Sequence, residues 1–295
     1  MNAPDMLTLA THVETLVRFG EGRRLTGTLC EPAASAEPDS SRPSGADRPV
    51  LLVFNAGVLP RTGPHRLNVK IARRFARAGW TVFRFDLSGQ GDSLAAGGTL
   101  GFERQSIADL RAAMDVLGER LGATRFASFG ICSGAVLGYA CALEDPRLVG
   151  CAMFDPYLYP TWRTPLYRMR AVIRRDGLWP VLAGFVRRRL APGAPATPAT
   201  SGVNLGLQDP PKAEFAAGLQ ALLARGVALR MLYSGSALYH YNYPGQFDDG
   251  FRAFGLAGRI RADFLPEVDH TVTAVAAQRF LVEHLLQWMD ETLAR

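Results

Sequence analysis

Short apolar runs of strand length recur along this chain of 295 residues, and segments with helical spacing of apolar residues separate them. The run 49–54 is apolar throughout, which is typical of a strand buried on both faces of a parallel sheet. Further strands are expected at 81–85, 126–129, 148–154, 228–233 and 260–264, and helices at 64–78, 102–121, 246–254 and 272–293. Because strands that alternate with helices are joined by right-handed crossovers, the sequence predicts an α/β fold with a mainly parallel, doubly wound sheet.

Two segments depart from this alternation. Residues 12–30 are expected to form two short strands, and a loop rich in Pro, Ser and Ala follows them at 31–48. Residues 156–226 interrupt the regular pattern, which indicates an inserted helical cap. The predicted organisation is therefore a core formed by residues 1–155 and 227–295, with the cap between its two parts.

Composition narrows the class of protein. Hydrophobic residues make up 48% of the chain and charged residues 20%, as in ordinary globular domains. No apolar run approaches the ~20 residues that a membrane-spanning helix needs, and the first residues lack the basic start of a signal peptide. The 4 cysteines are scattered without the paired spacing of a zinc site. We therefore expect a cytoplasmic protein with no membrane span, no metal and no cofactor.

The pentapeptide Gly-Ile-Cys-Ser-Gly at 130–134, between an expected strand and a small-residue helix, has the form of a nucleophile elbow. The nucleophile of such a turn has a strained backbone, and the residues two positions before and after it approach each other closely. Centred on Cys132, both flanks are glycine, whereas centring on Ser133 would place Ile131 at a flank, where it would clash. Cys132 is therefore the expected nucleophile, and a mere packing role for it is the alternative.

The same turn predicts how a developing negative charge on oxygen would be bound. The backbone N–H of Ser133 should lie at the N-terminus of the following helix, which also favours the thiolate form of Cys132. A second N–H donor is expected from the loop after the run 49–54, where Gly57 and Val58 are the candidates. A simple turn glycine is the other interpretation of Gly57.

His270 lies between the last expected strand and the last helix, a position from which a base can reach the nucleophile. The matching acid is less clear, because the loop 234–238 after the strand 228–233 contains no carboxylate. Asp155 directly follows the strand 148–154 and could orient the histidine instead. A cysteine depends less on a third residue than a serine does, so Asp155 and no acid at all both stay open.

Other titratable residues are weaker candidates. We interpret His284 as structural, because it lies in the amphipathic last helix, and His12 as remote from the elbow; His240 is expected to pack among tyrosines. Three carboxylates are less well placed than Asp155, and Asp269, next to the histidine, is expected to point away. Those three are Asp248, Asp249 and Glu267.

A set of motifs resembles the α/β-hydrolases associated with exosortase systems, which are related to the serine-aminopeptidase-like hydrolases. The matching residues are Asn55-Ala56-Gly57, Gly63-Pro64-His65-Arg66, Ala72-Arg73, Ala78-Gly79, Phe83-Arg84-Phe85-Asp86, Gly91-Asp92-Ser93, Gly130-Ile131-Cys132, Asp155-Pro156-Tyr157, Ser234-Gly235 and Asp269-His270-Thr271. The resemblance implies an α/β-hydrolase fold with an inserted helical cap. It also implies that Asp86 and Asp92 belong to a structural turn.

Two departures from that family bear on the acid. The family tends to carry an aspartate in the loop after Ser234-Gly235, where this chain has Ala237. It also tends to have asparagine at the position of Asp155. Together, the aspartate missing at Ala237 and the aspartate present at Asp155 look like an acid moved from one strand end to another, so the resemblance favours Asp155.

The expected cap is rich in arginine, and the chain has a net charge of +6. The arginines are Arg163, Arg168, Arg170, Arg174, Arg175 and Arg187-Arg188-Arg189, with Trp162, Tyr167, Trp179 and Phe185 among them. Because arginine binds phosphate and carboxylate well, an acyl carrier protein or coenzyme A would fit this surface. A solvated helix face and genomic codon bias are alternative explanations of the charge. No motif supports nucleic-acid binding.

A thiol nucleophile suits thioester exchange, because its attacking and leaving groups have similar basicity. The sequence therefore predicts a thioesterase or acyltransferase that works through an acyl-Cys132 intermediate on a thioester or ester. A small-ester or lactone hydrolase is the second enzyme hypothesis. A non-catalytic binding protein that has lost its acid is the third.

Overall fold

The computed structural model describes residues 12–33, 48–177, 209–237 and 241–294. In these ranges the strands form one eight-stranded sheet in the order β1-β2-β4-β3-β5-β6-β7-β8. Their bounds are His12–Phe19 (β1), Leu25–Pro32 (β2), Val50–Val53 (β3), Val82–Phe85 (β4), Phe126–Ile131 (β5), Leu148–Phe154 (β6), Ala228–Ser234 (β7) and Arg261–Leu265 (β8). Strand β2 pairs antiparallel with β1 and β4, and every other pair is parallel. The predicted α/β architecture is confirmed.

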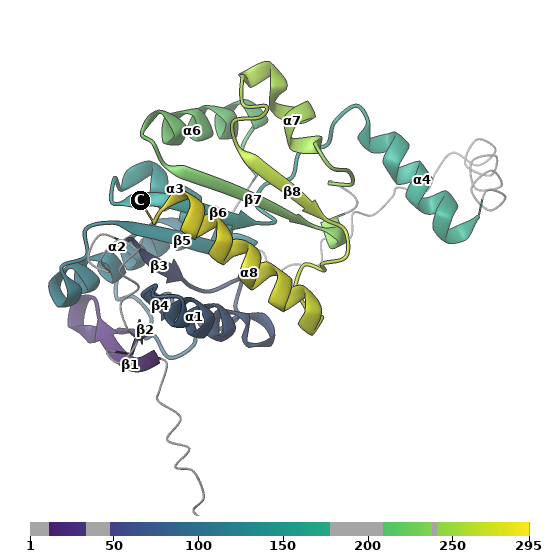
Figure 1. Ribbon diagram of the computed structural model, residues 1–295. Helices are drawn as coiled ribbons and strands as arrows, with labels where there is room; N and C mark the ends of the chain where they lie inside the picture. The colour runs from purple at the N-terminus through teal and green to yellow at the C-terminus, as the bar shows by residue number, and fades with distance from the viewer. Residues whose placement is uncertain (1–11, 34–47, 178–208, 238–240, 295) are drawn as a thin grey trace, which may run out of the picture.

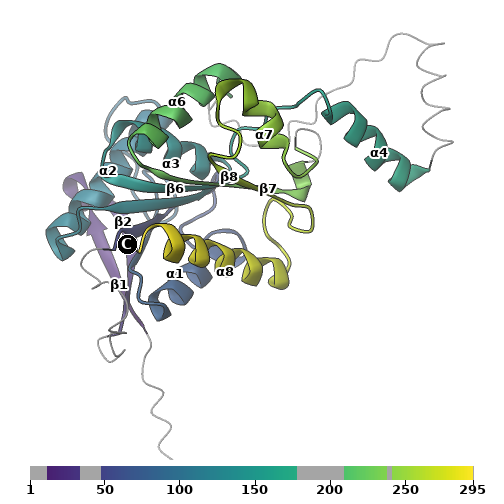
Figure 2. The same ribbon diagram turned by 45° about the horizontal axis from the view of Figure 1, so that its top comes forward.

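Helices cover both faces of the sheet (Figures 1 and 2). One face carries α1 (Leu67–Arg77) and α8 (Val275–Thr292), and the other carries α2 (Phe102–Leu121), α3 (Ser133–Glu144), α6 (Lys212–Ala224) and α7 (Gln246–Phe251). Short 3-10 helices lie at Glu21–Arg23, Pro64–Arg66, Gly235–Ala237 and Arg252–Phe254.

Strand β3 explains why its run is apolar throughout. Leu51 and Val53 pack towards α1 and α8, while Val50 and Leu52 pack towards the helices of the other face. Successive side chains of a strand point to opposite faces, so a strand with helices on both sides needs apolar residues at every position.

The segment expected to form a cap contains two helices that differ in their surroundings. Helix α4 (Thr164–Asp176) projects away from the sheet, and its first turn contacts the body through Tyr167, whose ring stacks on that of Tyr243 at 4.5 Å. Helix α6 instead packs on the sheet and contributes Phe215 and Leu219 to the core. The limits 156–226 stay a prediction, because residues 178–208, with Trp179, Phe185 and Arg187–Arg189, lie outside the described residues.

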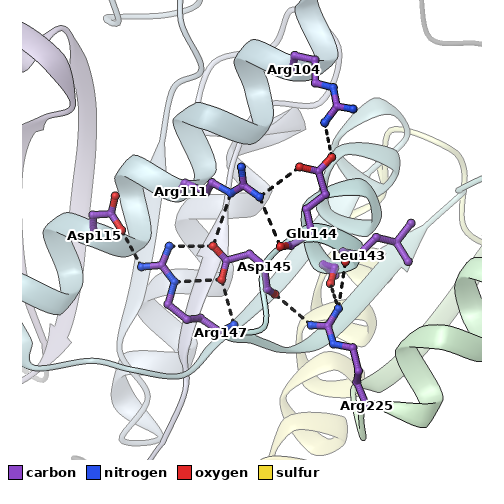
Figure 3. A network of polar contacts seen from close by, with 9 residues as sticks. Arg104, Arg111, Asp115, Leu143, Glu144, Asp145, Arg147 and Arg225 are labelled. Carbon is purple, nitrogen blue, oxygen red and sulfur yellow. Dashed lines mark hydrogen bonds and ion pairs between the residues drawn. The ribbon is translucent and has the colours of Figure 1, made fainter.

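The C-terminal end of α3 is held by a polar network (Figure 3). Arg225, just after α6, donates to the carbonyl oxygens of Ala142 at 2.7 Å, Leu143 at 3.2 Å and Asp145 at 3.2 Å. Arg111 of α2 binds the Glu144 carboxylate at 3.2 Å. These cations offset the negative end of the helix dipole and bind carbonyls that no later turn of α3 can satisfy. The network thus anchors the helix whose other end begins at the elbow.

None of the described helices is long and apolar enough to cross a membrane.

Candidate active site

Cys132 lies in the sharp turn between β5 and α3. Its backbone has φ 55° and ψ −119°, a conformation that is costly for a residue with a side chain. A Cβ atom built on Gly130 would lie 2.2 Å from the carbonyl carbon and oxygen of Gly134. The glycine at 130 is therefore a steric requirement of a turn centred on Cys132. Cys132 is exposed, whereas Cys30, Cys141 and Cys151 are buried.

His270 contacts both of its expected partners. Its Nδ1 lies 2.7 Å from Oδ2 of Asp155, and its ring lies close enough to the side chain of Cys132 for the two to interact. The Asp155 carboxylate is buried and accepts a second hydrogen bond from the Ser234 N–H at 2.7 Å through its other oxygen. The His270 N–H donates to Ser236 Oγ at 3.0 Å, which ties the histidine loop to the end of β7.

These contacts set the charge of the imidazole. The hydrogen bond that the ring donates to the Asp155 carboxylate, and then the interaction with Cys132, raise the pKa of His270 from 6.5 to about 10, against the opposing effect of burial. His270 is therefore protonated at neutral pH in the free protein.

The other carboxylates weighed from the sequence have different partners. Asp269 binds the Thr271 hydroxyl at 2.8 Å and the Thr273 N–H at 2.8 Å, and so it is turned away from the ring of His270. Asp248 accepts from the Gly258 N–H at 3.0 Å, and Asp249 accepts from the Tyr243 hydroxyl at 2.9 Å. Among the carboxylates considered, Asp155 is the one that binds His270.

The loop after β3 packs against the elbow. A Cβ atom on Gly134 would lie 2.7 Å from the carbonyl oxygen of Asn55, so the loop can approach the elbow this closely only because residue 134 has no side chain. Gly57 has φ 59°, and its N–H donates to Ser133 Oγ at 2.8 Å. Val58 carries an exposed side chain. The expected donor loop thus lies beside Ser133, but the contact runs through the Ser133 hydroxyl, which no sequence pattern predicts.

Asp86 supports the same loop. Its carboxylate is buried and accepts hydrogen bonds from Asn55 Nδ2 at 3.2 Å, from the Arg61 N–H at 2.6 Å and from the Asp92 N–H at 3.1 Å. A carboxylate so fully engaged holds the loops after β3 and β4 together, in line with the structural turn that the resemblance implies.

The other histidines weighed from the sequence have partners of their own or lie outside the described residues. His284 of α8 binds Asp263 at 2.9 Å and also contacts Arg230, which agrees with a structural role. His240 lies outside the described residues. In the described part of the chain the potential metal-ligating atoms of His12, Glu14 and Cys30 lie within 4.8 Å of one another. Arg73 already binds Glu14 at 3.0 Å, so the charge there is balanced without a cation.

Comparisons with known proteins bear on the fold. A family model described as serine aminopeptidase, S33, matches residues 65–201. An esterase of Pyrococcus furiosus superposes with a TM-score of 0.54 at 11% identity, covering 99% of this chain and 94% of that one. No curated protein sequence matches the chain.

Two further solved structures are similar. A hypothetical protein from Pseudomonas aeruginosa has a TM-score of 0.58 at 13% identity and covers 96% of this chain and 95% of its own. A cold-adapted esterase from an Arctic intertidal metagenomic library has a TM-score of 0.52 at 15% identity, with 99% and 98% covered. The chain has the α/β-hydrolase fold.

In α/β-hydrolases the nucleophile, the acid and the histidine follow one another in that order along the chain. Here Cys132 follows β5, Asp155 follows β6 and His270 follows β8. All three therefore lie at the carboxyl edge of the parallel strands, where open α/β sheets bind their ligands.

Proposed function

We propose that the protein is an acyl-transfer enzyme, a thioesterase or acyltransferase, in which Cys132 is the nucleophile, His270 the acid and base, and Asp155 the residue that orients the histidine. The contact of His270 with both Cys132 and Asp155 is the observation that carries this proposal. The exposure of Cys132 and its strained elbow add support.

The chemistry follows from this arrangement. The Cys132 thiolate attacks the carbonyl carbon, so that an S–C bond forms and the π electrons of the carbonyl move to its oxygen. The carbonyl then re-forms as the bond to the leaving thiol or alcohol breaks, and that group takes a proton from His270. Neutral His270 next accepts the proton of the incoming water or acceptor. The new bond forms at the acyl carbon, and Cys132 leaves as thiolate.

Asp155 has two effects in this scheme. Its bond to Nδ1 leaves Nε2 of His270 for the sulfur, and its charge stabilises the protonated ring. A thioester is the favoured substrate class, because a thiolate displaces a thiolate of similar basicity.

The second candidate is a small-ester or lactone hydrolase. Its support is the likeness to two esterases and to the serine aminopeptidase model. The same three residues would serve, and the difference lies in which leaving group the enzyme accepts.

Partners of the enzyme are a separate prediction. An acyl carrier protein or coenzyme A would bind near α4, where Arg163 lies 3.2 Å from Asp249 and Arg170 lies over the ring of Tyr167 at 5.9 Å. The association with exosortase systems rests on the sequence motifs alone.

The proposal is tested by intact-protein mass spectrometry after mixing the enzyme with an acyl thioester, such as octanoyl-N-acetylcysteamine, or with p-nitrophenyl octanoate. We expect one acyl adduct on the wild-type protein and none on Cys132→Ala. Cys141→Ala is the control that should keep the adduct, because burial raises the pKa of that thiol to about 12. Faster acylation by the thioester favours the first candidate, and turnover of the ester alone favours the second.

The proposal fails if wild-type protein forms no adduct and Cys132→Ala retains full turnover. In that case the thiol is not the nucleophile.

A further inference from the structure

The side chain of Ser133 occupies an unexpected place at the site. Ser133 follows the nucleophile and is the first residue of α3, and it is buried. Its Oγ accepts a hydrogen bond of 2.8 Å from the N–H of Gly57. That N–H is one of the donors expected to bind the substrate oxygen directly, and the structure shows it engaged by the serine hydroxyl.

The hydrogen-bonding capacity of a hydroxyl decides what this contact allows. A serine hydroxyl has one O–H donor and two acceptor lone pairs. By accepting from Gly57 it fixes its oxygen and keeps its proton free. Within the described residues, no other hydrogen bond involves Ser133 Oγ. The hydroxyl can therefore donate to a group that enters the site.

The nearest group that needs such a donor is the substrate oxygen. When a carbonyl carbon is bonded to Cys132 Sγ, its oxygen lies beside Ser133, the next residue. Ser133 is the first residue of α3, so its backbone N–H has no carbonyl one turn earlier to bind and can donate to that oxygen. The hydroxyl belongs to the same residue and is held on the side of the Gly57 loop.

We propose that the Ser133 hydroxyl donates a hydrogen bond to the oxyanion that forms during acyl transfer, and that the Gly57 N–H is a positioning group that holds this hydroxyl. The assignment rests on the proposed function, since it needs an acyl group on Cys132. The oxyanion receives the backbone N–H and the side-chain O–H of one residue. No proton is transferred: the hydroxyl only hydrogen-bonds the oxygen while the carbonyl π electrons reside on it.

The assignment predicts different effects on two reactions of the same thiolate, acylation and alkylation. Attack on a thioester places negative charge on oxygen, whereas alkylation by iodoacetamide displaces iodide and develops no oxyanion. Loss of the hydroxyl should therefore slow acylation and leave alkylation unchanged. Removing one oxyanion donor lowers kcat by about 100-fold or more in enzymes of this type of chemistry.

The experiment compares wild type, Ser133→Ala and the isosteric pair Ser133→Thr and Ser133→Val, which differ in the hydroxyl. We expect Ser133→Ala to acylate about 100-fold more slowly with nearly unchanged KM, and to react with iodoacetamide at the wild-type rate. Ser133→Thr should acylate faster than Ser133→Val by a similar factor. Thermal unfolding checks that each variant is folded. If Ser133→Ala does not fold, the comparison of Ser133→Thr with Ser133→Val tests the assignment instead.

The outcomes are distinct. If Ser133→Ala acylates as fast as wild type, or if Thr and Val are equal, the assignment is overturned and the proposed function stands. If Ser133→Ala acylates faster, the hydroxyl blocks the position of the substrate oxygen and must be displaced by it, which also overturns the assignment. Absence of any acyl adduct on wild-type Cys132, with full turnover retained in Cys132→Ala, would overturn the proposed function together with it.

Discussion

Oδ2 of Asp155 lies 2.7 Å from Nδ1 of His270, although 115 positions separate the two residues in the chain. Asp155 has φ 48° and follows β6 directly, so its carboxylate turns from the end of one strand towards the end of the next. The N–H of Ser234 holds the other carboxylate oxygen at 2.7 Å. The acid therefore reaches the histidine past the end of β7, whose own loop carries no carboxylate.

Replacing Asp155 by asparagine tests its role. We expect kcat/KM to fall by about 10- to 100-fold, less than the ~10⁴-fold that the equivalent change costs a serine triad, because a thiol ionises without the help of a third residue. The pKa of His270 should fall towards its ordinary value, as its largest cause of elevation is removed. NMR titration of the ring protons measures this shift. Asp269→Asn is the matched control and should change neither quantity.

The raised pKa of His270 predicts how stability depends on pH. The group binds its proton more tightly in the folded state, with a pKa of about 10 against 6.5 when unperturbed. Its contribution is therefore fully present below pH 6.5 and is lost as the pH rises through 10. The difference in unfolding free energy between wild type and His270→Gln, measured by urea denaturation, should shrink between these values. A constant difference across that range would contradict the assignment.

Gly130 should tolerate no side chain. A Cβ atom there would lie 2.2 Å from the backbone of Gly134, which neither the strand nor the helix can relieve without moving the elbow. We expect Gly130→Ala to lower the unfolding free energy by about 3 kcal/mol and to abolish acylation. Gly98→Ala is the control, since a Cβ atom at that position meets nothing within 4 Å. Chemical denaturation measures both variants, and equal stabilities would refute the steric argument.

Arg225 should contribute to stability through the end of α3. Its three hydrogen bonds to carbonyl oxygens are lost in Arg225→Ala (Figure 3), and we expect a cost of about 1–2 kcal/mol. The comparison is Arg252→Ala, because Arg252 is largely exposed and lies 3.6 Å from Asp249, where an ion pair is worth about 0.5 kcal/mol. Thermal unfolding of the two variants gives the difference. Equal effects would show that the network does not hold α3.

Local patterns were sufficient to predict most of the elements. The strand expected at 148–154 and the helix expected at 102–121 have those bounds in the structure. Both segments are apolar at the spacing of a single element type, so residues close in the chain determine them. The cap limits 156–226 stay a prediction; within them, α6 packs on the sheet as a core helix.

The elbow could be predicted from the sequence for the same reason. The close approach of residues 130 and 134 is a contact between neighbours in the chain, so the identity of Ile131 was enough to place the centre of the turn at Cys132. The sequence alone thus determined the α/β architecture, the centre of the turn at Cys132 and the strand ends from which the partners of Cys132 come.

Only the tertiary structure decided how those partners meet. The carboxylate that binds His270 depends on the order of β6, β7 and β8 in the sheet and on the direction in which Asp155 leaves its strand. The contact of Gly57 with the Ser133 hydroxyl depends on the packing of two loops 76 residues apart. Hydrogen bonds of a few ångströms between distant segments are set by how whole layers pack, and no local pattern in the chain encodes them.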